Sequence, residues 1–324
     1  MFHQSRIGGL LINLKLPGIL SDPWFAFVFG AKLYYLSDME KTRQPKPEWL
    51  KVRLPQGKEY SRLKKLLRQH QLNTVCENAL CPNVAECWGA GTATFLILGE
   101  VCTRACKFCA IKSGRPPVYD IEEPARVAAA IQKLKLRYAV ITSVDRDDLQ
   151  DGGAFIFAET IRKTRELCPR IGIETLIPDF RGDREALKTV VDAKPDVLAH
   201  NVETVPRLYP VARQGSRYRR SLDHLRNAKS FGVDITTKSS IMLGLGETIE
   251  EALSVLRDLR EVCVDIVTLG QYLQPTRDHL PVARYYALEE FAELRDFCRS
   301  LGFTHVESSP LSRSSYHAEK LSNI

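Results

Sequence analysis

The feature that most constrains the fold is an alternation of strand and helix patterns that begins after Pro117 and continues almost to the end of the 324-residue chain. Short apolar runs predict strands, and longer segments with apolar residues three or four positions apart predict helices. The predicted strands are 94–98, 138–143, 171–177, 197–201, 235–243, 266–273 and 304–307. The predicted helices are 122–134, 154–167, 184–192, 221–231, 248–262 and 288–301. Such alternation gives a parallel sheet with right-handed crossovers.

The pattern supplies six or seven strand–helix units, too few for a complete eight-unit barrel. We therefore predict an α/β fold, a partial (β/α)6-type TIM barrel with an N-terminal extension that carries cysteines and a closing C-terminal segment. The predicted divisions are an extension over 1–38, an N-terminal region over 39–90, the barrel over 91–302 and the closing segment over 303–324. Polar clusters follow several strands, at the edge of the sheet where barrel chemistry gathers.

Six of the nine cysteines lie between Val75 and Pro116 and form two triads. The first triad, Cys76, Cys81 and Cys87, has the spacing C-x4-C-x5-C. The second triad, Cys102, Cys106 and Cys109, has the spacing C-x3-C-x2-C. An odd total of nine cysteines, six of them clustered in one short stretch, is unlike the disulfide framework of a secreted domain. In a reducing compartment such cysteines more often hold metal.

Three thiolates on a loop directly after a strand are one ligand short of a closed zinc site. For a four-iron cluster, the same deficit leaves one iron free to bind something else. A zinc knuckle with a distant fourth ligand is the alternative. The remaining cysteines, Cys168, Cys263 and Cys298, lie on or beside predicted helices and are expected to be small buried hydrophobic residues.

The second triad, within CTRACKFC, resembles the signature of the radical S-adenosylmethionine superfamily. The resemblance implies a 4Fe-4S cluster on Cys102, Cys106 and Cys109, whose free iron binds the amino and carboxylate groups of S-adenosylmethionine. Transfer of an electron then gives a 5′-deoxyadenosyl radical. Phe108 matches the aromatic position that contacts the adenine in that superfamily.

The first triad, within CENALCPNVAECW, together with the C-terminal RSSYHA of Arg313–Ala318, resembles the lipoyl synthase family. This resemblance extends from about Trp49 to the end and includes TSVDRDDLQDGGA, HNVETV, KSSIMLGLGE and GQYLQPT. It implies a second, auxiliary 4Fe-4S cluster on the first triad and Ser315. A serine oxygen is a harder and weaker ligand for iron than thiolate. Without the resemblance, Ser314 and Ser315 would be read as a turn pair.

The implied reaction is that of a sulfurtransferase, which inserts two sulfur atoms at C6 and C8 of a protein-bound octanoyl-lysine, with the auxiliary cluster as sulfur donor. The implied partners are octanoylated lipoyl-domain proteins, namely the E2 subunits of 2-oxoacid dehydrogenases and the glycine cleavage H protein. An electron donor such as ferredoxin or flavodoxin is also implied. A net charge of +7 without a dense basic block gives no indication of a nucleic-acid partner.

Several further residues are candidates for holding the cofactor or the substrate. Three side chains at or near strand ends are candidates for binding the adenosyl ribose and methionyl groups, namely Glu174, Asn201 and Glu203. Two glycines would let the backbone approach the cofactor closely, namely Gly244 and Gly246. Residues 145–148 are predicted to hold the substrate peptide, and Arg313 to order the C-terminal serine. Ordinary solvated loops are the alternative for each.

Residues 1–38 are apolar and aromatic, but no uninterrupted run reaches the ~20 residues of a membrane helix. They also lack the regions of a secretory signal, and Met39, where the composition turns polar, is a candidate translation start. We expect a cytoplasmic protein without membrane partners, or one of the plastid stroma if the extension is a transit peptide.

Two other classes of function remain open. One is a two-cluster radical enzyme in which the auxiliary cluster persists and serves electron transfer or substrate binding. The other is a non-enzymatic iron–sulfur carrier or zinc-stabilised binding protein. RSSYHA argues against the first, and the strand–helix body argues against the second.

Overall fold

The computed structural model describes residues 45–50, 58–70, 72–78, 81, 83–89, 92–231 and 234–316. All of them belong to one compact unit, Gln44–Ile324. The predicted extension over 1–38 and the candidate start Met39 lie outside the described residues, and the predicted boundaries at 90 and 302 stay predictions. Within the described ranges, no helix is long and apolar enough to cross a membrane.

The centre of the fold is an eight-stranded sheet whose strands lie side by side in chain order. The strands are β1 (Asn73–Thr74), β2 (Thr92–Ile97), β5 (Tyr138–Ser143), β6 (Gly172–Leu176), β7 (Val197–Ala199), β8 (Thr236–Leu243), β9 (Ile266–Gln271) and β10 (His305–Ser308). From β2 to β10 all neighbours are parallel, and β1 pairs antiparallel with β2. Among the described residues β10 pairs only with β9, so the sheet stays open and the predicted partial barrel is confirmed.

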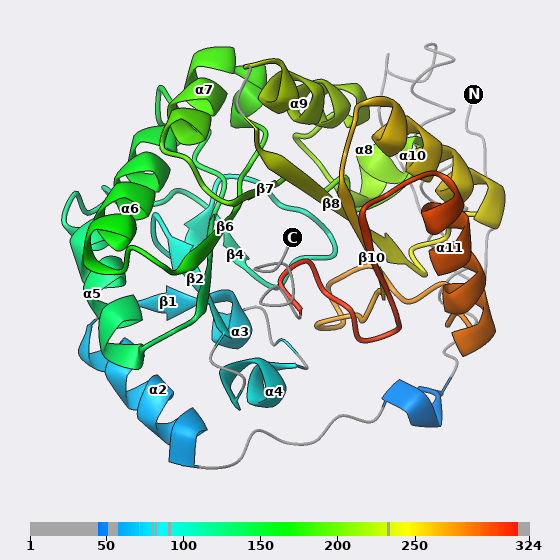
Figure 1. Cartoon of the computed structure of the whole chain (residues 1–324). Coiled ribbons are helices and arrows are strands. Elements are labelled where there is room, and N and C mark those ends of the chain that lie inside the picture. Colours follow the sequence, from blue (N-terminus) through cyan, green and yellow to red (C-terminus); the bar gives the residue numbers. More distant parts are fainter. Residues whose placement is uncertain are drawn as a thin grey trace, which may run out of the picture. The chain divides into compact units, whose positions relative to one another are not determined.

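The crossover helices lie on the outer side of the curved sheet (Figure 1). They are α5 (Glu123–Leu134), α6 (Ala154–Leu167), α7 (Arg184–Asp192), α9 (Tyr218–Ser230), α10 (Ile249–Glu261) and α11 (Leu288–Ser300). The predicted bounds of these helices and of the parallel strands agree with the structure to within three residues. Every residue of β2 is buried, as expected for a parallel strand covered on both faces.

Smaller elements lie before the sheet and in its loops. They are η1 (Glu48–Leu50), α2 (Lys58–Gln69), α3 (Val75–Asn78), α4 (Val84–Gly89), β3 (Val101–Cys102), β4 (Lys112–Ser113), η2 (Phe180–Gly182), η3 (Pro206–Leu208) and α8 (Tyr209–Ala212). Helix α2 packs on α4. Lys64 of α2 also forms a 3.0 Å ion pair with Glu77 of α3, so the elements that precede the sheet are joined to one another.

The three cysteines outside the triads differ in their surroundings. Cys298 is buried in α11, as predicted, and Cys168 is partly exposed. The prediction that Cys263 is buried is wrong, because its side chain is exposed. Cys263 follows the end of α10 with a left-handed backbone (φ 62°), which takes it out of the apolar face of that helix.

Two buried histidines join the end of β7 to α9. His200 Nδ1 lies 2.9 Å from the Ile177 carbonyl oxygen and its Nε2 lies 3.0 Å from Ser221 Oγ. The ring of His224 packs edge-on against that of His200, with centroids 5.2 Å apart. Burial lowers the pKa of both imidazoles, that of His224 to about 4. Both rings are therefore neutral in the folded protein at neutral pH.

These histidines predict a loss of stability in mild acid. The pKa of His224 in the folded protein lies below its unfolded value near 6.5, so the unfolded chain binds the proton first. Above about pH 6.5 His224 is neutral in both states, so its burial costs no stability through protonation. As the pH falls from about 6.5 towards 4, the unfolded chain gains the proton and the free energy of unfolding decreases. Between pH 7 and pH 5, the free energy of unfolding of His224→Leu should fall by about 2 kcal/mol less than that of the wild type. Urea unfolding at both pH values checks this, and equal losses would contradict it.

Candidate active site

The second cysteine triad lies on the loop that follows β2, as the sequence predicts. Cys102 is in β3, which pairs with β4 so that Cys102 lies opposite Ser113. The Gly114 amide donates to the Cys102 carbonyl oxygen at 2.9 Å and closes the loop. The Cys109 amide donates to the carbonyl oxygen of Cys106 at 3.1 Å, which turns the backbone between these two thiols. The three thiols are thus presented by one short loop at the carboxyl edge of the sheet.

Backbone contacts from distant parts of the chain hold this loop from two sides. The Lys107 amide donates to the Ala212 carbonyl oxygen at 2.8 Å, and the Lys107 carbonyl accepts from the Leu280 amide at 2.9 Å. His279 Nε2 lies 2.8 Å from the carbonyl oxygen of Cys109. The segment between β9 and α11 therefore supports the cysteine loop directly. Nothing in the sequence pattern indicated this role, since both His279 and Leu280 act on backbone atoms far away in the chain.

The most extensive support comes from Arg104, which lies between the first two cysteines and is almost fully buried. Its guanidinium donates to both carboxylate oxygens of Asp147 at 2.8 Å and to Asp179 at 2.7 Å. Asp145 lies 3.1 Å away. Asp179 also accepts a hydrogen bond from Arg220 Nε at 2.7 Å. One guanidinium therefore joins the cysteine loop to the loops that follow β5 and β6.

The prediction that residues 145–148 hold a substrate peptide stays a prediction, but each charged side chain there has a partner within the chain. Asp145 and Asp147 lie against Arg104. Arg146 is buried and donates to Asp148 at 2.9 and 2.8 Å. It also donates to the carbonyl oxygens of Leu98 and Pro117. These side chains position the loops around the cysteines.

The thiols of the second triad suit an iron–sulfur cluster, because the positive charge of its iron ions would stabilise the thiolate forms. Burial, with a smaller contribution from the neighbouring cysteines, raises the pKa of Cys106 to about 12 and that of Cys109 to about 11. Metal ligation requires thiolates, so iron would displace these protons. Among the described residues, no three His, Cys, Asp or Glu side chains gather as they would around one metal ion. Three thiols from one loop suit the separate irons of a cluster.

Glu203 lies close enough to the cysteine loop for its charge to act on Cys109, while the cofactor roles of Asn201 and Glu203 stay predictions. Asn201 Nδ2 donates to Glu203 Oε1 at 3.0 Å, while its buried Oδ1 has no hydrogen-bond partner in the described part of the chain. The charge of Glu203 raises the pKa of Cys109, and that of Arg213 lowers the pKa of Cys106. Arg213, which the sequence reasoning missed, donates to the Asn201 carbonyl oxygen at 2.7 Å. The free amide oxygen suits a donor group on a bound ligand.

Glu174 and Gly244 have partners inside the protein instead. Glu174 lies in the middle of the five-residue β6, two residues before the end of the strand. Both of its buried carboxylate oxygens accept from Lys238 Nζ at 3.0 Å. A Cβ on Gly244 would lie 2.3 Å from Gln271 Nε2, so packing within the chain already requires glycine there. Cofactor roles for these two, for Gly246 and for the half-buried Phe108 stay predictions.

The first triad is spread over α3, α4 and the turn between them. Cys76 lies in α3 and Cys87 in α4, and the Cys81 amide donates to the Cys76 carbonyl oxygen at 3.2 Å. Burial raises the pKa of Cys76 to about 11, and the proximity of Cys81 adds to the shift. The Cys87 amide donates to the Asn83 carbonyl oxygen at 3.0 Å, at the start of α4. The two cysteine-bearing helices flank a common turn.

The C-terminal segment 309–316 crosses the end of β9. The Gln271 amide donates to the Pro310 carbonyl oxygen at 3.0 Å, and the Ser309 amide donates to Leu269 at 3.2 Å. A Cβ on Gly270 would lie 2.0 Å from the Ser312 carbonyl oxygen, so only glycine lets the segment lie this close to the strand. The position of segment 309–316 is thus fixed on the barrel side.

On its other side, segment 309–316 reaches the first triad. Asn83 Nδ2 donates to the Leu311 carbonyl oxygen at 2.6 Å, and the Tyr316 hydroxyl donates to Glu86 at 3.0 Å. Burial raises the pKa of Cys81, and the charge of the half-buried Arg313 opposes part of that shift. The segment after the last strand therefore contacts the region before the first parallel strand. His317 and Ala318 of the RSSYHA motif lie outside the described residues. The role of Ser315 as a ligand stays a prediction.

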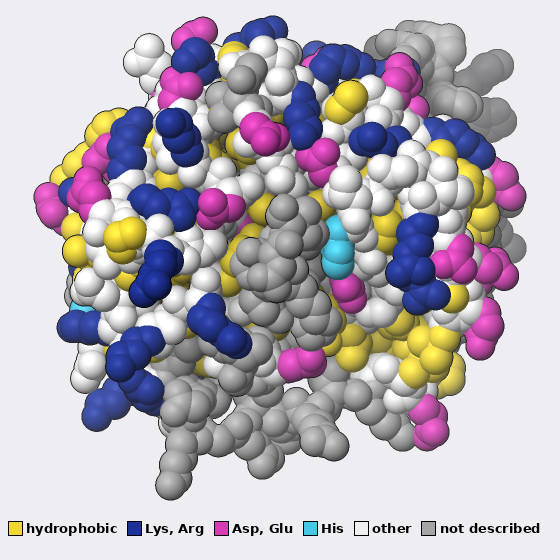
Figure 2. Space-filling model, in the orientation of Figure 1, with side chains coloured by type: hydrophobic (Ala, Val, Ile, Leu, Met, Phe, Trp, Pro, Cys, Tyr) yellow, Lys and Arg dark blue, Asp and Glu magenta, His cyan; other side chains and the backbone are white. Residues whose placement is uncertain are grey.

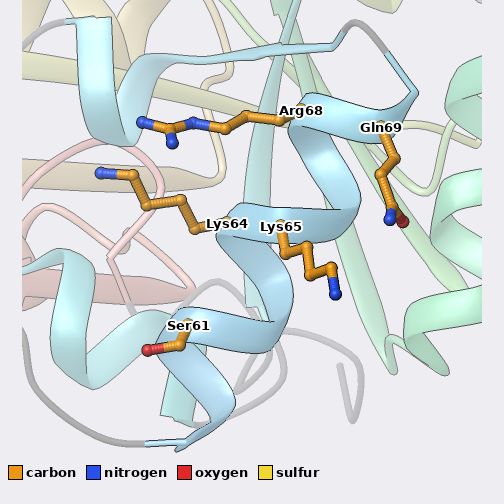
Figure 3. Close-up of a pocket in the computed structure, with 5 residues that line it drawn as sticks. All are labelled: Ser61, Lys64, Lys65, Arg68 and Gln69. Atoms are coloured by element: carbon orange, nitrogen blue, oxygen red, sulfur yellow. The ribbon is translucent and has the colours of Figure 1, made fainter.

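A shallow pocket lies on α2 (Figure 3). It is lined by one helix alone, through Ser61, Lys64, Lys65, Arg68 and Gln69. Lys64 and Arg68 extend from one side of the helix, whereas Lys65 and Gln69 extend from the other (Figure 3). Basic side chains are also dense over this part of the face in Figure 2, with acidic ones among them. The pocket contains no cysteine and is a feature of the surface.

The fold and the cysteine loop define a radical S-adenosylmethionine enzyme. The Radical SAM superfamily pattern matches residues 96–259. Methylornithine synthase (PylB) has the same fold, with a TM-score of 0.50, 17% identity and coverage of 80% of each chain. SuiB of Streptococcus suis, bound to its precursor peptide SuiA, gives a TM-score of 0.52 at 12% identity, covering 88% of this chain and 62% of its own. Superfamily membership brings a 4Fe-4S cluster and S-adenosylmethionine.

More specifically, the chain belongs to the lipoyl synthase family. The pattern of the N-terminal domain of lipoyl synthase matches residues 34–81. Lipoyl synthase of Rubrobacter xylanophilus is 56% identical over 281 residues, which cover 87% of this chain and 88% of the relative. The mitochondrial lipoyl synthase of Nematostella vectensis is 52% identical, with coverage of 86% and 95%. That of Geobacillus sp. (strain WCH70) is 55% identical, with coverage of 86% and 94%.

Arg104 should be indispensable to the stability of the loop. Arg104→Met leaves the buried carboxylate of Asp179 with fewer partners, so the free energy of unfolding should fall by about 3–5 kcal/mol. Arg226→Met is the matched control, because it breaks the exposed pair with Asp223 and should cost at most about 1 kcal/mol. Denaturant unfolding compares the two variants, and similar small losses in both would contradict the role given to Arg104.

Proposed function

We propose that this chain inserts two sulfur atoms at C6 and C8 of an octanoyl group held in amide linkage by a lysine of a lipoyl-domain protein. Membership of the lipoyl synthase family supports the reaction class. The single observation that carries the proposal further is the meeting of segment 309–316 with the first triad, through Asn83–Leu311 and Glu86–Tyr316. These contacts support a second site whose ligands would come from two distant parts of the chain.

The residues of the two sites have separate roles in this proposal. Cys102, Cys106 and Cys109 would hold the radical cluster, and Cys76, Cys81, Cys87 and Ser315 would hold an auxiliary 4Fe-4S cluster that is the sulfur donor. When bound, the radical cluster and S-adenosylmethionine supply the 5′-deoxyadenosyl radical needed to break an unactivated C–H bond. The protein orients the octanoyl chain between the two sites and keeps water from the radical. Asn201 and Glu203 would hold polar groups of S-adenosylmethionine.

The proposed partners follow from the reaction. E2 subunits of 2-oxoacid dehydrogenases and the glycine cleavage H protein would present the octanoyl-lysine. A ferredoxin or flavodoxin would supply the electron. All nine cysteines are free of disulfides, which suits the reducing cytoplasm that we propose as the compartment.

The first test combines iron content with turnover. After anaerobic reconstitution, the chain should bind roughly 8 iron atoms, as two four-iron clusters require. With S-adenosylmethionine, a reductant and an octanoyl-lysine peptide, it should give the dithiolated peptide, detected by mass spectrometry. Roughly 4 iron atoms per chain, or a peptide without sulfur, would contradict the proposal. A full iron content with turnover that leaves the auxiliary cluster intact would favour a persistent cluster instead.

The second test concerns the serine ligand. Ser315→Ala should still cleave S-adenosylmethionine, because the radical triad is untouched. Its yield of thiolated peptide should fall by about 10-fold or more, as expected when a metal site loses a supporting group. Ser314→Ala is the matched control at the neighbouring position and should retain the wild-type yield. If Ser315→Ala gave the wild-type yield, Ser315 would not be the ligand.

A further inference from the structure

Segment 309–316 is attached to α4 at two points, and the serine pair of the RSSYHA motif lies between them. The first attachment is Asn83 to Leu311 and the second is Glu86 to Tyr316. The Tyr316 amide donates to the Arg313 carbonyl oxygen at 2.9 Å, which forms a turn containing Ser314 and Ser315. The serine pair is thus part of a short loop that is fastened at one end to Asn83, the residue before α4, and at the other end to Glu86 within α4.

The two attachments differ in strength. Asn83 is buried, with 5% of its surface exposed, and its amide is only 2.6 Å from the carbonyl oxygen that it binds. The Tyr316–Glu86 hydrogen bond is exposed to solvent, where water competes with it. Asn83 is therefore the main fastening.

Asn83 also orders the cysteine side of the same site. It lies between Cys81 and Cys87, and its carbonyl oxygen accepts from the amides of Glu86 and Cys87 at 3.1 and 3.0 Å. The main chain of Asn83 starts α4 and positions Cys87, while its side chain holds the segment that carries Ser315. Asn83 thus joins the stretch that carries the first triad to a segment that lies 228 residues further along the chain.

We propose that Asn83 is the positioning residue for the auxiliary cluster, fastening the Ser315 segment to the first cysteine triad through the Leu311 carbonyl. This inference rests on the proposed function, since it assumes that Ser315 is a ligand of that cluster. The side chain at this position must present a donor, as the amide of Asn83 does, because the carbonyl of Leu311 can only accept a hydrogen bond. Aspartate starts a helix as well as asparagine does, but it presents oxygens alone.

Asn83→Asp is therefore the test variant, because it preserves the shape and the start of α4 while removing the donor. After anaerobic reconstitution, its iron content should fall from roughly 8 towards roughly 4 atoms per chain. Cleavage of S-adenosylmethionine should stay at the wild-type rate, since the radical triad is unaltered. Asn227→Asp is the matched control, because the Oδ1 of Asn227 accepts from Arg184 and an aspartate still can.

Trypsin provides a readout that needs no cluster. Arg313 is half-buried in segment 309–316, and its guanidinium donates to the carbonyl oxygens of Pro310 and Ser312, so the iron-free wild type should be cut slowly after this residue. Asn83→Asp should be cut severalfold faster, because the segment detaches more often. Tyr316→Phe, which leaves α4 unchanged, should give a smaller increase. If Asn83→Asp fails to fold, the rate of cleavage in Tyr316→Phe still tests the attachment, and a wild-type rate there would contradict it.

A double variant separates positioning from a general structural role. If Asn83 acts through Ser315, Asn83→Asp should cause no further loss of iron in a Ser315→Ala background. Additive losses would overturn the inference, as would an iron content near 8 together with wild-type proteolysis in Asn83→Asp alone. A wild-type iron content near 4 would instead remove the auxiliary cluster and the proposed function with it.

Discussion

The guanidinium of Arg104 is the interaction on which the carboxyl edge of the sheet depends. It is nearly fully buried and meets carboxylates from the loops after β5 and β6, and Ser216 ahead of α9. A buried charge is tolerated only when its partners are in place, so the conformations of these loops depend on one another. Because Arg104 lies between Cys102 and Cys106, the same network fixes the loop that carries the thiols.

The open sheet has a second structural consequence. The antiparallel strand β1 covers one edge, and β10 forms the other. The chain that leaves β10 returns across the end of β9 and reaches α4, which lies just ahead of the first parallel strand. A closed barrel would join the first and last strands by hydrogen bonds and leave no place for this crossing. Segment 309–316 joins the two ends of the barrel by a few side-chain contacts instead.

Sequence reasoning predicted β5, α6 and α7 to the residue because their periodic patterns are long and local. It missed α3 and α4, which are too short to show any period. It also missed Arg104 and Arg213, whose partners depend on the tertiary fold. Glu174 was expected to hold the cofactor, and its buried pairing with Lys238 depends on the tertiary fold, which brings β6 and β8 close together.

The two cysteine sites are held by interactions of different strength. The loop of Cys102 is fixed by buried ion pairs, and breaking such a pair costs about 3–5 kcal/mol. Segment 309–316 is fastened to α4 by hydrogen bonds, one of them exposed, and a typical one contributes about 0.5–1.5 kcal/mol. The segment that carries Ser315 can therefore open without disturbing the loop of Cys102. This difference suits the proposed function, in which the radical cluster survives each turnover while the auxiliary cluster is taken apart and rebuilt.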